Sequence, residues 1–271
     1  MGFEKKPTRR KTDSTFRKNS DKKRKRIDQD KDKPAQKSTR LNKYIAQSGV
    51  CSRREADEII KSGKIRVNDK TITEMGYQVN PGDKVHYGKK LLSKERLIYL
   101  LLNKPKDFIT TTDDPQERKT IMKLVAKACD ERIYPVGRLD RNTTGVLLMT
   151  NDGDLSKKLT HPSHEVGKVY QLELNKPIEN EHFEKIKEGI ELEDGFVKVD
   201  DIAILDPEGY SLGVEIHSGK NRIVRRVFES FRYDVSKLDR VMFAGLTKKD
   251  LPRGNWRFLR DKEIVKLKYL N

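Results

Sequence analysis

The segment between Gly137 and Gly145 combines one acid with two bases in a pattern that can support covalent chemistry. Asp140 lies between Arg138 and Arg141, and the sequence around it holds no His or Cys cluster that would make it a metal ligand. A lone loop aspartate is usually a turn former or a helix cap. An aspartate kept ionised by cations can instead act as a nucleophile or as a general base. The arginines on either side suit the phosphates of an RNA chain.

A tyrosine and a group of arginines further along the chain also suit a nucleic-acid substrate. Residues 168–174 alternate as a strand, in which Tyr170 either packs in the core or stacks on a nucleobase. After Gly219, Asn221 is expected to cap a helix with one apolar face. Its opposite face is expected to carry three arginines in one stripe: Arg222, Arg225 and Arg226. This stripe is either a solvated face or a site for bidentate contacts with carboxylate or phosphate.

Four alternating or apolar runs are expected to form the strands that position these residues: 97–102, 145–150, 168–174 and 212–216. Asn151-Asp152-Gly153 predicts a turn, and Asp154 is expected to cap a short helix after it. His161 and His164 form a conceivable metal pair, but without a third ligand a loop is favoured. We therefore expect no metal site.

Residues 39–88 have the pattern of a separate small module. A short helix is expected to end at Gly49. Ser52 and Glu55 then form a capping box for a helix that Gly63 terminates. Arg53 and Arg54 lie at the start of that helix, where backbone N–H groups already favour an anion. Lys43, Lys61 and Lys64 can extend this basic face along a phosphate chain, or they can be a solvated surface.

The chain is strongly basic, with 59 Lys and Arg against 42 Asp and Glu in 271 residues and a net charge of +17. Residues 1–38 hold fifteen of these cations and six acids, and are almost without apolar side chains, so we expect a disordered basic tail. The tail either tracks phosphates weakly or only aids solubility. With only two cysteines, no 20-residue apolar run and no apolar signal-peptide core, the composition excludes a disulfide scaffold and favours a cytoplasmic protein that binds nucleic acid.

Two families are recognisable in these motifs. Three runs resemble the RNA-binding module named after ribosomal protein S-four: Arg40-Leu-Asn-Lys-Tyr-Ile-Ala, Cys51-Ser-Arg-Arg-Glu-Ala-Asp and Gly63-Lys-Ile-Arg-Val-Asn. Four further runs resemble the ribosomal pseudouridine synthases. They are Asn103-Lys104-Pro105, Gly137 to Gly145, Lys168-Val-Tyr170 and Gly219 to Arg226. The resemblance is to the group formed by the type A enzymes of the small ribosomal RNA and the type B enzymes of the large one. The last run is most similar to type B.

The resemblance implies isomerisation of a uridine in ribosomal RNA, most closely large-subunit RNA, by a monomer that needs neither metal nor cofactor. It implies three catalytic residues. Asp140 would act on the base or the ribose, Arg225 would pair with Asp140, and Tyr170 would stack on a uracil flipped out of the RNA. RNA contacts are expected from Arg40, Lys43, Arg53, Arg54, Lys61, Lys64, Arg138, Arg141, Lys168, Lys220, Arg222 and Arg226.

We therefore expect an α+β protein in three parts. The tail of residues 1–38 is followed by a small α/β RNA-binding domain with its linker at 39–96. A catalytic domain at 97–271 should contain a mixed, mostly antiparallel sheet flanked by helices. The alternative is a ribosome-assembly factor that binds RNA on the same fold without catalysis. A DNA-binding protein is disfavoured because no helix has base-reading residues at the required spacing.

Overall fold

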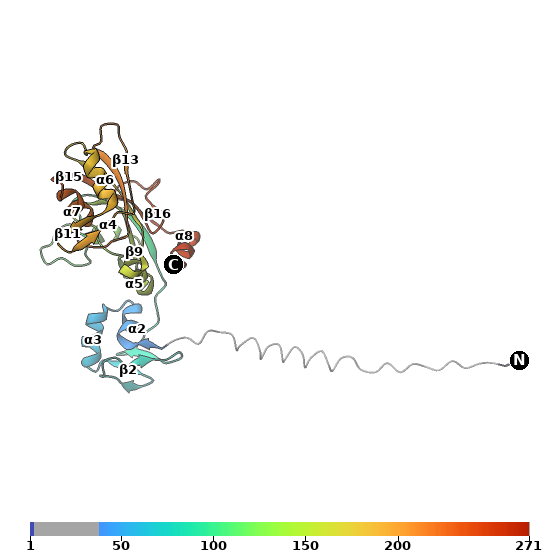
Figure 1. The fold of residues 1–271 in the computed structure, drawn as a ribbon. Helices are drawn as coiled ribbons and strands as arrows, with labels where there is room; N and C mark the ends of the chain where they lie inside the picture. Colours follow the sequence, from blue (N-terminus) through green and yellow to red (C-terminus); the bar gives the residue numbers. More distant parts are fainter. Residues whose placement is uncertain (3–37, 271) are drawn as a thin grey trace. The chain divides into compact units, whose positions relative to one another are not determined.

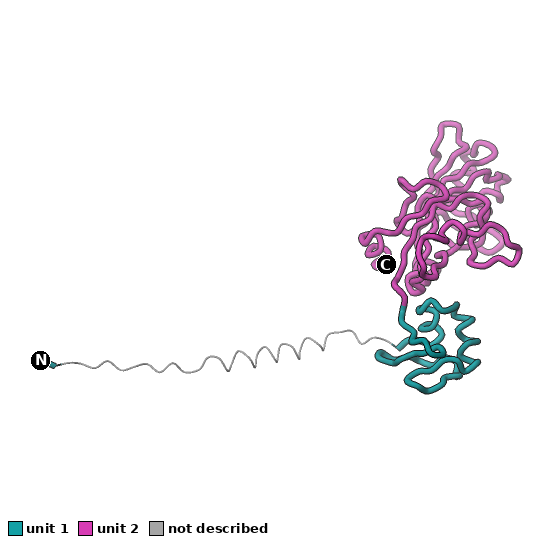
Figure 2. The backbone as a smooth tube through the Cα atoms, turned by 180° about the vertical axis from the view of Figure 1, so that it is seen from behind, with its two compact units in different colours: residues 1–94 teal, residues 95–271 magenta. Residues whose placement is uncertain are grey.

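The computed structural model describes residues 1–2 and 38–270, and divides the chain into two compact units at Lys94/Glu95 (Figure 2). The boundary expected from the sequence lies two residues later. The predicted tail lies almost wholly outside the described residues. Within the described ranges, no helix is long and apolar enough to cross a membrane.

The first unit contains two helices and short antiparallel strands (Figure 1). Its helices are α2 (Leu41–Gln47) and α3 (Arg53–Lys61). The four-stranded sheet has the order β3-β2-β5-β6, and β1 pairs with β4. The strands are β1 (Thr39–Arg40), β2 (Ile65–Val67), β3 (Lys70–Thr71), β4 (Gln78–Val79), β5 (Val85–Tyr87) and β6 (Lys90–Leu91).

Local sequence signals explain the helices of this unit. Ser52 accepts from the backbone N–H of Glu55, whose side chain accepts from the backbone of Ser52, so the predicted capping box is confirmed. Gly63 follows α3 with φ +71°, which a glycine adopts without strain. Ile45, Ala56 and other apolar residues of the two helices meet the sheet in one buried core. Lys90 and Leu91 form β6, the last strand of this unit.

The second unit is built around a mixed sheet in which nine of the described strands take part. Its main path has the order β13-β14-β10-β15-β9-β7-β17, with β8 added to β9 and β16 added to β15. All pairings are antiparallel except that of β15 with β9, which confirms the predicted mixed, mostly antiparallel sheet.

The nine strands are β7 (Tyr99–Lys104), β8 (Tyr134–Pro135), β9 (Thr144–Thr150), β10 (Lys168–Leu174), β13 (Asp201–Ile204), β14 (Ser211–Ile216), β15 (Val235–Phe243), β16 (Leu246–Thr247) and β17 (Trp256–Phe258). The hairpin β11 (Ile190–Leu192) and β12 (Gly195–Val197) is separate. The helices are α4 (Met122–Val125), α5 (Gly153–Thr160), the 3-10 turn η1 (Pro162–His164), α6 (Asn180–Glu188), α7 (Ile223–Glu229) and α8 (Asp261–Lys268).

Strand β9 is buried along its whole length and apolar from Val146 to Met149, because both faces of the sheet are covered there. Val146 and Leu148 pack in one cluster with residues of α5 and α8. Leu147 and Met149 pack in a second cluster with residues of α4. A continuous apolar run is the pattern of a strand buried on both sides. The segment just before β9, which contains Asp140, is thereby anchored to the best-packed part of the unit.

Two expected helix caps are wrong. Asp152 caps α5 by accepting from the backbone N–H of Leu155, and Asp154 lies in the first turn. Helix α7 starts at Ile223, with Arg222 rather than Asn221 at its N-cap in a left-handed conformation, φ +45°. Both errors come from reading a cap off residue type, when the local backbone decides which side chain reaches the first turn.

Candidate active site

Asp140 lies in the loop between β8 and β9, at the wall of a cavity of about 270 Å³. The cavity brings together several segments that are distant in the sequence. The Asp140 loop forms one side, Tyr170 of β10 and Arg240 of β15 contribute from the sheet, and residues 217–224 contribute the approach to α7. Arg138 is exposed and lines this cavity and a second one of about 300 Å³, both of which include Asp140.

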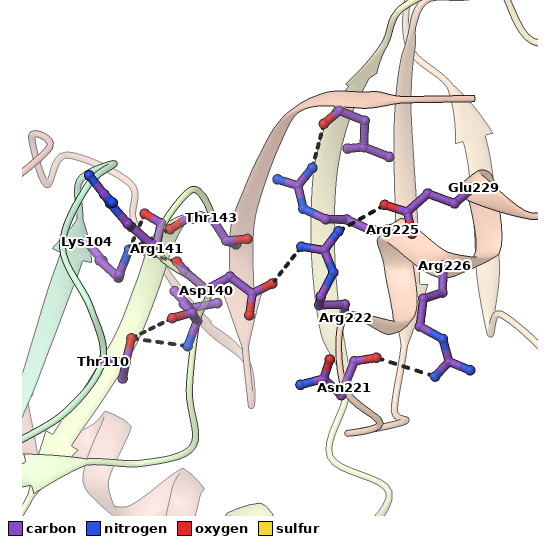
Figure 3. Close-up of polar contacts among 12 residues, drawn as sticks. Lys104, Thr110, Asp140, Arg141, Thr143, Asn221, Arg222, Arg225, Arg226 and Glu229 are labelled. Carbon is purple, nitrogen blue, oxygen red and sulfur yellow. Dashed lines mark hydrogen bonds and ion pairs between the residues drawn. The ribbon is translucent and has the colours of Figure 1, made fainter. Parts of the chain in front are cut away.

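Lys104 holds the backbone of this loop. The side chain, fully buried at the end of β7, donates from its amine to four backbone carbonyls: Pro105 at 3.1 Å, Asp140 at 3.0 Å, Arg141 at 3.3 Å and Thr143 at 2.8 Å (Figure 3). Burial lowers the pKa of Lys104 to about 8, against the opposing influence of the acidic Asp140 and Asp107.

Thr110 holds the loop from the other side. Its hydroxyl donates to the carbonyl oxygen of Leu139 at 2.7 Å and accepts from the N–H of Leu139 at 3.3 Å (Figure 3). Asp107 adds an ion pair with Arg141 at 3.4 Å. The loop is thus fixed through main-chain contacts, and the Asp140 carboxylate is left directed at the cavity and at α7.

The ion pair of Asp140 differs from the predicted one. A guanidinium nitrogen of Arg222 lies 4.0 Å from a carboxylate oxygen of Asp140, and Arg222 also bonds Glu229 at 2.9 Å (Figure 3). Arg225, expected to pair with Asp140, is buried and donates to the carbonyl of Val235 at 2.5 Å. The expectation that Arg222, Arg225 and Arg226 share the face opposite the apolar one is therefore wrong, because Arg225 is buried and Arg222 precedes the helix.

Arg225 still acts on Asp140 electrostatically. Burial lowers the pKa of Arg225, and the nearby charge of Arg222 lowers it further, while Asp140 raises it. The pair of arginines thus surrounds one carboxylate with positive charge, with Arg222 in ion-pair range and Arg225 behind it.

Gly145 allows the two halves of the sheet to meet beside the site. It has φ +106° and lies opposite Arg240 in the parallel pairing of β9 with β15. A Cβ atom there would overlap the backbone of Arg240 and the side chain of Asp239. Asp239 is itself fixed by Lys248, by Arg253 at 3.1 Å and by the hydroxyl of Thr144 at 2.9 Å.

Three cations that were expected to bind RNA are engaged elsewhere. Lys168 donates its amine to the carbonyls of Val166 at 2.8 Å and His217 at 2.5 Å, so it joins two segments of the cavity wall. Arg226 makes a bidentate pair with Asp194 at 2.6 and 2.9 Å, and Lys220 donates to the Asp194 carbonyl at 2.7 Å. The contacts of Asp194 hold the loop between β11 and β12 against α7 and the segment before it. The RNA contacts expected from these three cations stay predictions.

The first unit presents its expected cations at the surface. Arg40, Arg53, Arg54, Lys61 and Lys64 are exposed and Lys43 is half-buried. Arg53 and Arg54 are the first two residues of α3, and Lys61 pairs with Glu58 at 2.9 Å. Because a helix N-terminus attracts anions, the two arginines add to a site that already favours phosphate.

Sequence reasoning missed Thr110, Asp194 and Arg240. Nothing in the run around Thr110 distinguishes its hydroxyl from that of Thr111. Arg240 had a detectable signal, since a cation in the otherwise apolar inward positions of a strand is unusual. No group of three or more His, Cys, Asp or Glu side chains that could hold a metal ion occurs within 1–2 and 38–270.

Comparison with known proteins identifies the class. Residues 98–230 match the family described as RNA pseudouridylate synthase, and residues 39–85 match the S4 domain. An RNA pseudouridine synthase of Aquifex aeolicus (strain VF5), described as uncharacterized, is 38% identical over 84% of this chain and 93% of its own length. A crystal structure of a pseudouridylate synthase matches with a TM-score of 0.62 and 30% identity, over 85% of this chain and 100% of that one.

This chain belongs to the family of RNA pseudouridine synthases, which are isomerases. Two relatives have more specific names. Ribosomal large subunit pseudouridine synthase B of Bacillus subtilis (strain 168) is 38% identical over 85% of this chain and 96% of that protein. The dual-specificity RNA pseudouridine synthase RluF of Escherichia coli (strain K12) is 36% identical over 85% of this chain and 78% of that protein. The resemblance noted in the sequence is thus confirmed.

Proposed function

We propose that this enzyme isomerises a uridine in ribosomal RNA, specifically in large-subunit RNA, and that Asp140 carries the reaction. The large-subunit target rests on the name of the Bacillus subtilis relative, which aligns with 96% of its length. The role of Asp140 rests on its place at the cavity wall, with the loop backbone held by Lys104 and the carboxylate 4.0 Å from Arg222.

The reaction exchanges one bond of the nucleoside for another. The bond between N1 of uracil and C1′ of ribose breaks, the uracil turns, and C5 bonds to C1′. The proton at C5 is then lost and N1 gains one, so no oxidant, reductant or transferred group is needed. Asp140 acts either as a nucleophile or as the base that removes a ribose proton. In both routes Arg222 lies in ion-pair range of its carboxylate.

The target base must leave its stack to reach Asp140, and the residues around the cavity suit a flipped nucleotide. We assign Tyr170, which lines the cavity from β10, to stacking on the extruded uracil. Arg138 is exposed and lines both cavities. We assign it to filling the gap that the extruded base leaves in the RNA stack, or to binding the adjacent phosphate. The first unit holds the surrounding RNA through Arg53 and Arg54. We further propose action as a monomer in the cytoplasm, since one chain supplies Asp140, Tyr170 and Arg222 to one cavity.

Mapping pseudouridines in ribosomal RNA from cells with and without this protein tests the target. We expect the loss of one or a few defined sites in large-subunit RNA, restored by a copy of the wild-type gene. Loss of sites only in small-subunit RNA would contradict the proposed target in the large one. An unchanged map of all ribosomal RNA would contradict ribosomal RNA as the substrate.

A further inference from the structure

Arg240 is a buried cation in the cavity that contains Asp140. Its side chain is 3% exposed, yet it lines the cavity together with Tyr170. In the sheet, Arg240 lies directly opposite Tyr170 of β10 and opposite Gly145 of β9. Side chains of directly opposite residues on one face of an antiparallel pair have their Cβ atoms about 4.5–5.5 Å apart. Arg240 and the tyrosine that we assign to stacking therefore start from neighbouring positions on the sheet, and both side chains line the same cavity.

A bulge in β15 places Arg240 on this face. Val169 pairs with Met242 and Tyr170 pairs with Arg240, so Val241 has no directly opposite residue in β10. The extra residue brings Arg240 and Phe243 to the same side of the strand. The guanidinium carbon accordingly lies 4.7 Å from the centre of the Phe243 ring. Bulges that redirect a side chain are common beside active sites.

The guanidinium of Arg240 has fewer hydrogen-bond partners than it has N–H donors. Its Nε donates to the carbonyl of Val146 at 2.8 Å, which fixes the side chain across β9. Its Nη2 is buried and has no hydrogen-bond partner among the described residues. Arg240 forms no ion pair with an Asp or Glu of the described residues, and the adjacent Asp239 pairs with Lys248 and Arg253. A buried charged donor without a partner is costly unless a ligand supplies the acceptor.

The surrounding charge also favours a ligand rich in acceptors. Lys168 lines the same cavity, and its pKa is lowered to about 8, first by burial and then by the charge of Arg240. Two cations therefore face one region of the cavity, while Asp140 lies on its loop side with Arg222. Uracil carries two carbonyl oxygens at the edge of its ring, which can accept hydrogen bonds. A stacked tyrosine contacts only the face of the ring.

We propose that Arg240 is a substrate-contacting residue whose amino nitrogens donate to a carbonyl oxygen of the uracil flipped into the cavity. The inference rests on the proposed function. When the N1–C1′ bond breaks, its electron pair stays on the uracil and the negative charge spreads to the carbonyl oxygens. A fixed donor at one of these oxygens stabilises that charge, and loss of such a donor typically slows a reaction by about 10²–10³-fold.

The test compares wild type, Arg240→Met and Arg240→Lys on a synthetic RNA that carries the mapped target uridine. The same RNA is prepared with 2-thiouridine or 4-thiouridine at the target, because sulfur is a weaker acceptor than oxygen. We expect Arg240→Met to lower the single-turnover rate by about 10²–10³-fold with unchanged RNA affinity. One of the two thio substitutions should slow wild type by a larger factor than it slows Arg240→Met. A purely structural role of Arg240 would not produce this difference.

Arg257→Met is the control, since Arg257 is a half-buried, ion-paired arginine of β17 outside the cavity, and we expect its rate to match wild type. Thermal unfolding checks all variants. If Arg240→Met does not fold, Arg240→Lys, which keeps the cation over Phe243 but not the planar donor pair, serves in the same comparison.

Equal effects of the thio substitutions on the rates of wild type and variant would overturn the proposal. Weaker RNA binding with a shallower salt dependence would overturn it in favour of a phosphate contact. An inactive wild-type enzyme would overturn the proposed function itself.

Discussion

Asp140 is positioned by contacts to its backbone rather than to its carboxylate. The amine of Lys104 donates to the carbonyls of Asp140, Arg141 and Thr143. The hydroxyl of Thr110 donates to the carbonyl of Leu139 and accepts from its N–H. This arrangement fixes where the carboxylate lies without occupying its oxygens. An enzyme that uses the carboxylate as a nucleophile or base needs those oxygens available.

The buried amine of Lys104 makes stability depend on pH. Because the pKa of Lys104 is lowered to about 8 in the folded state, the unfolded chain binds more protons than the folded chain between about pH 8 and 10.5. The free energy of unfolding therefore rises with pH across this window. Lys104→Met lacks this contribution and leaves its carbonyls unsatisfied, which costs about 2–4 kcal/mol at pH 7.

Urea unfolding of wild type and Lys104→Met at several pH values from 7 to 10 checks this prediction. Lys168 also has a lowered pKa, but it is present in both proteins and cancels in the comparison. We expect the stability difference to widen above pH 8. A difference that narrows over the same range would contradict the assigned direction.

The sequence predicted three residues that line the cavity, but not the contacts they make. Asp140, Tyr170 and Arg222 were all named from their motifs, and all three line the cavity. The family resemblance implies a pairing of Asp140 with Arg225, whereas the ion pair in the structure is with Arg222. Arg222 has a left-handed backbone outside the helix, and Arg225 is turned into the core. A single backbone conformation at residue 222 thus decides which arginine reaches the carboxylate.

At the scale of elements, the site depends on the parallel contact between β9 and β15. Gly145 is the residue that permits it, so Gly145→Ala combines a strained positive φ with an overlap against the backbone of Arg240. Strain alone costs about 1–3 kcal/mol, and overpacking adds a similar amount. We expect a loss of about 3–5 kcal/mol, measured by urea unfolding.

Gly254→Ala is the matched control for this prediction. Gly254 lies in the same unit with φ +85°, but nothing lies within 4 Å of the Cβ position. Its alanine variant should lose only the strain contribution. Equal destabilisation of the two variants would show that the overlap with β15 does not matter.

The sequence predicted elements well where the pattern was strong. The alternation of residues 168–174 and 212–216 matches β10 and β14, and the apolar run before Asn151 matches β9, because burial on known faces dictates those patterns. The bulge in β15 and the short hairpin β11–β12 were not predicted. Their positions depend on contacts across the sheet and with α7, which a periodicity within one segment does not record.

On the scale of the whole molecule, the chain has a net charge of +17, but the cations of the two units differ in how many are already paired with acids. In the second unit, Asp194 engages Arg226 and Lys220, and Asp107 engages Arg141. In the first unit, Arg53 and Arg54 are exposed at the start of α3. We therefore assign most of the general attraction for phosphate to the first unit, and the orientation of one nucleotide to the second.

Replacing Arg53 and Arg54 together by alanine tests this division. The variant should bind ribosomal RNA more weakly, and the slope of log affinity against log salt should decrease by about 1–2, since two phosphate contacts are lost. Filter binding at several salt concentrations measures both quantities. Lys89→Ala with Lys90→Ala removes the same charge from the turn before β6 and its first residue. An equal change in slope for the two pairs would indicate a net-charge effect and contradict a specific site at α3.

The central claim is that Asp140 carries out uridine isomerisation in ribosomal RNA. The most direct measurement is pseudouridine formation by purified wild type, Asp140→Asn and the control Asp201→Asn, an exposed acid of β13, on unmodified large-subunit RNA with binding followed in parallel. The account predicts that Asp140→Asn binds the RNA as wild type does and forms no pseudouridine, while Asp201→Asn is fully active. Turnover by Asp140→Asn at the wild-type rate would contradict the account.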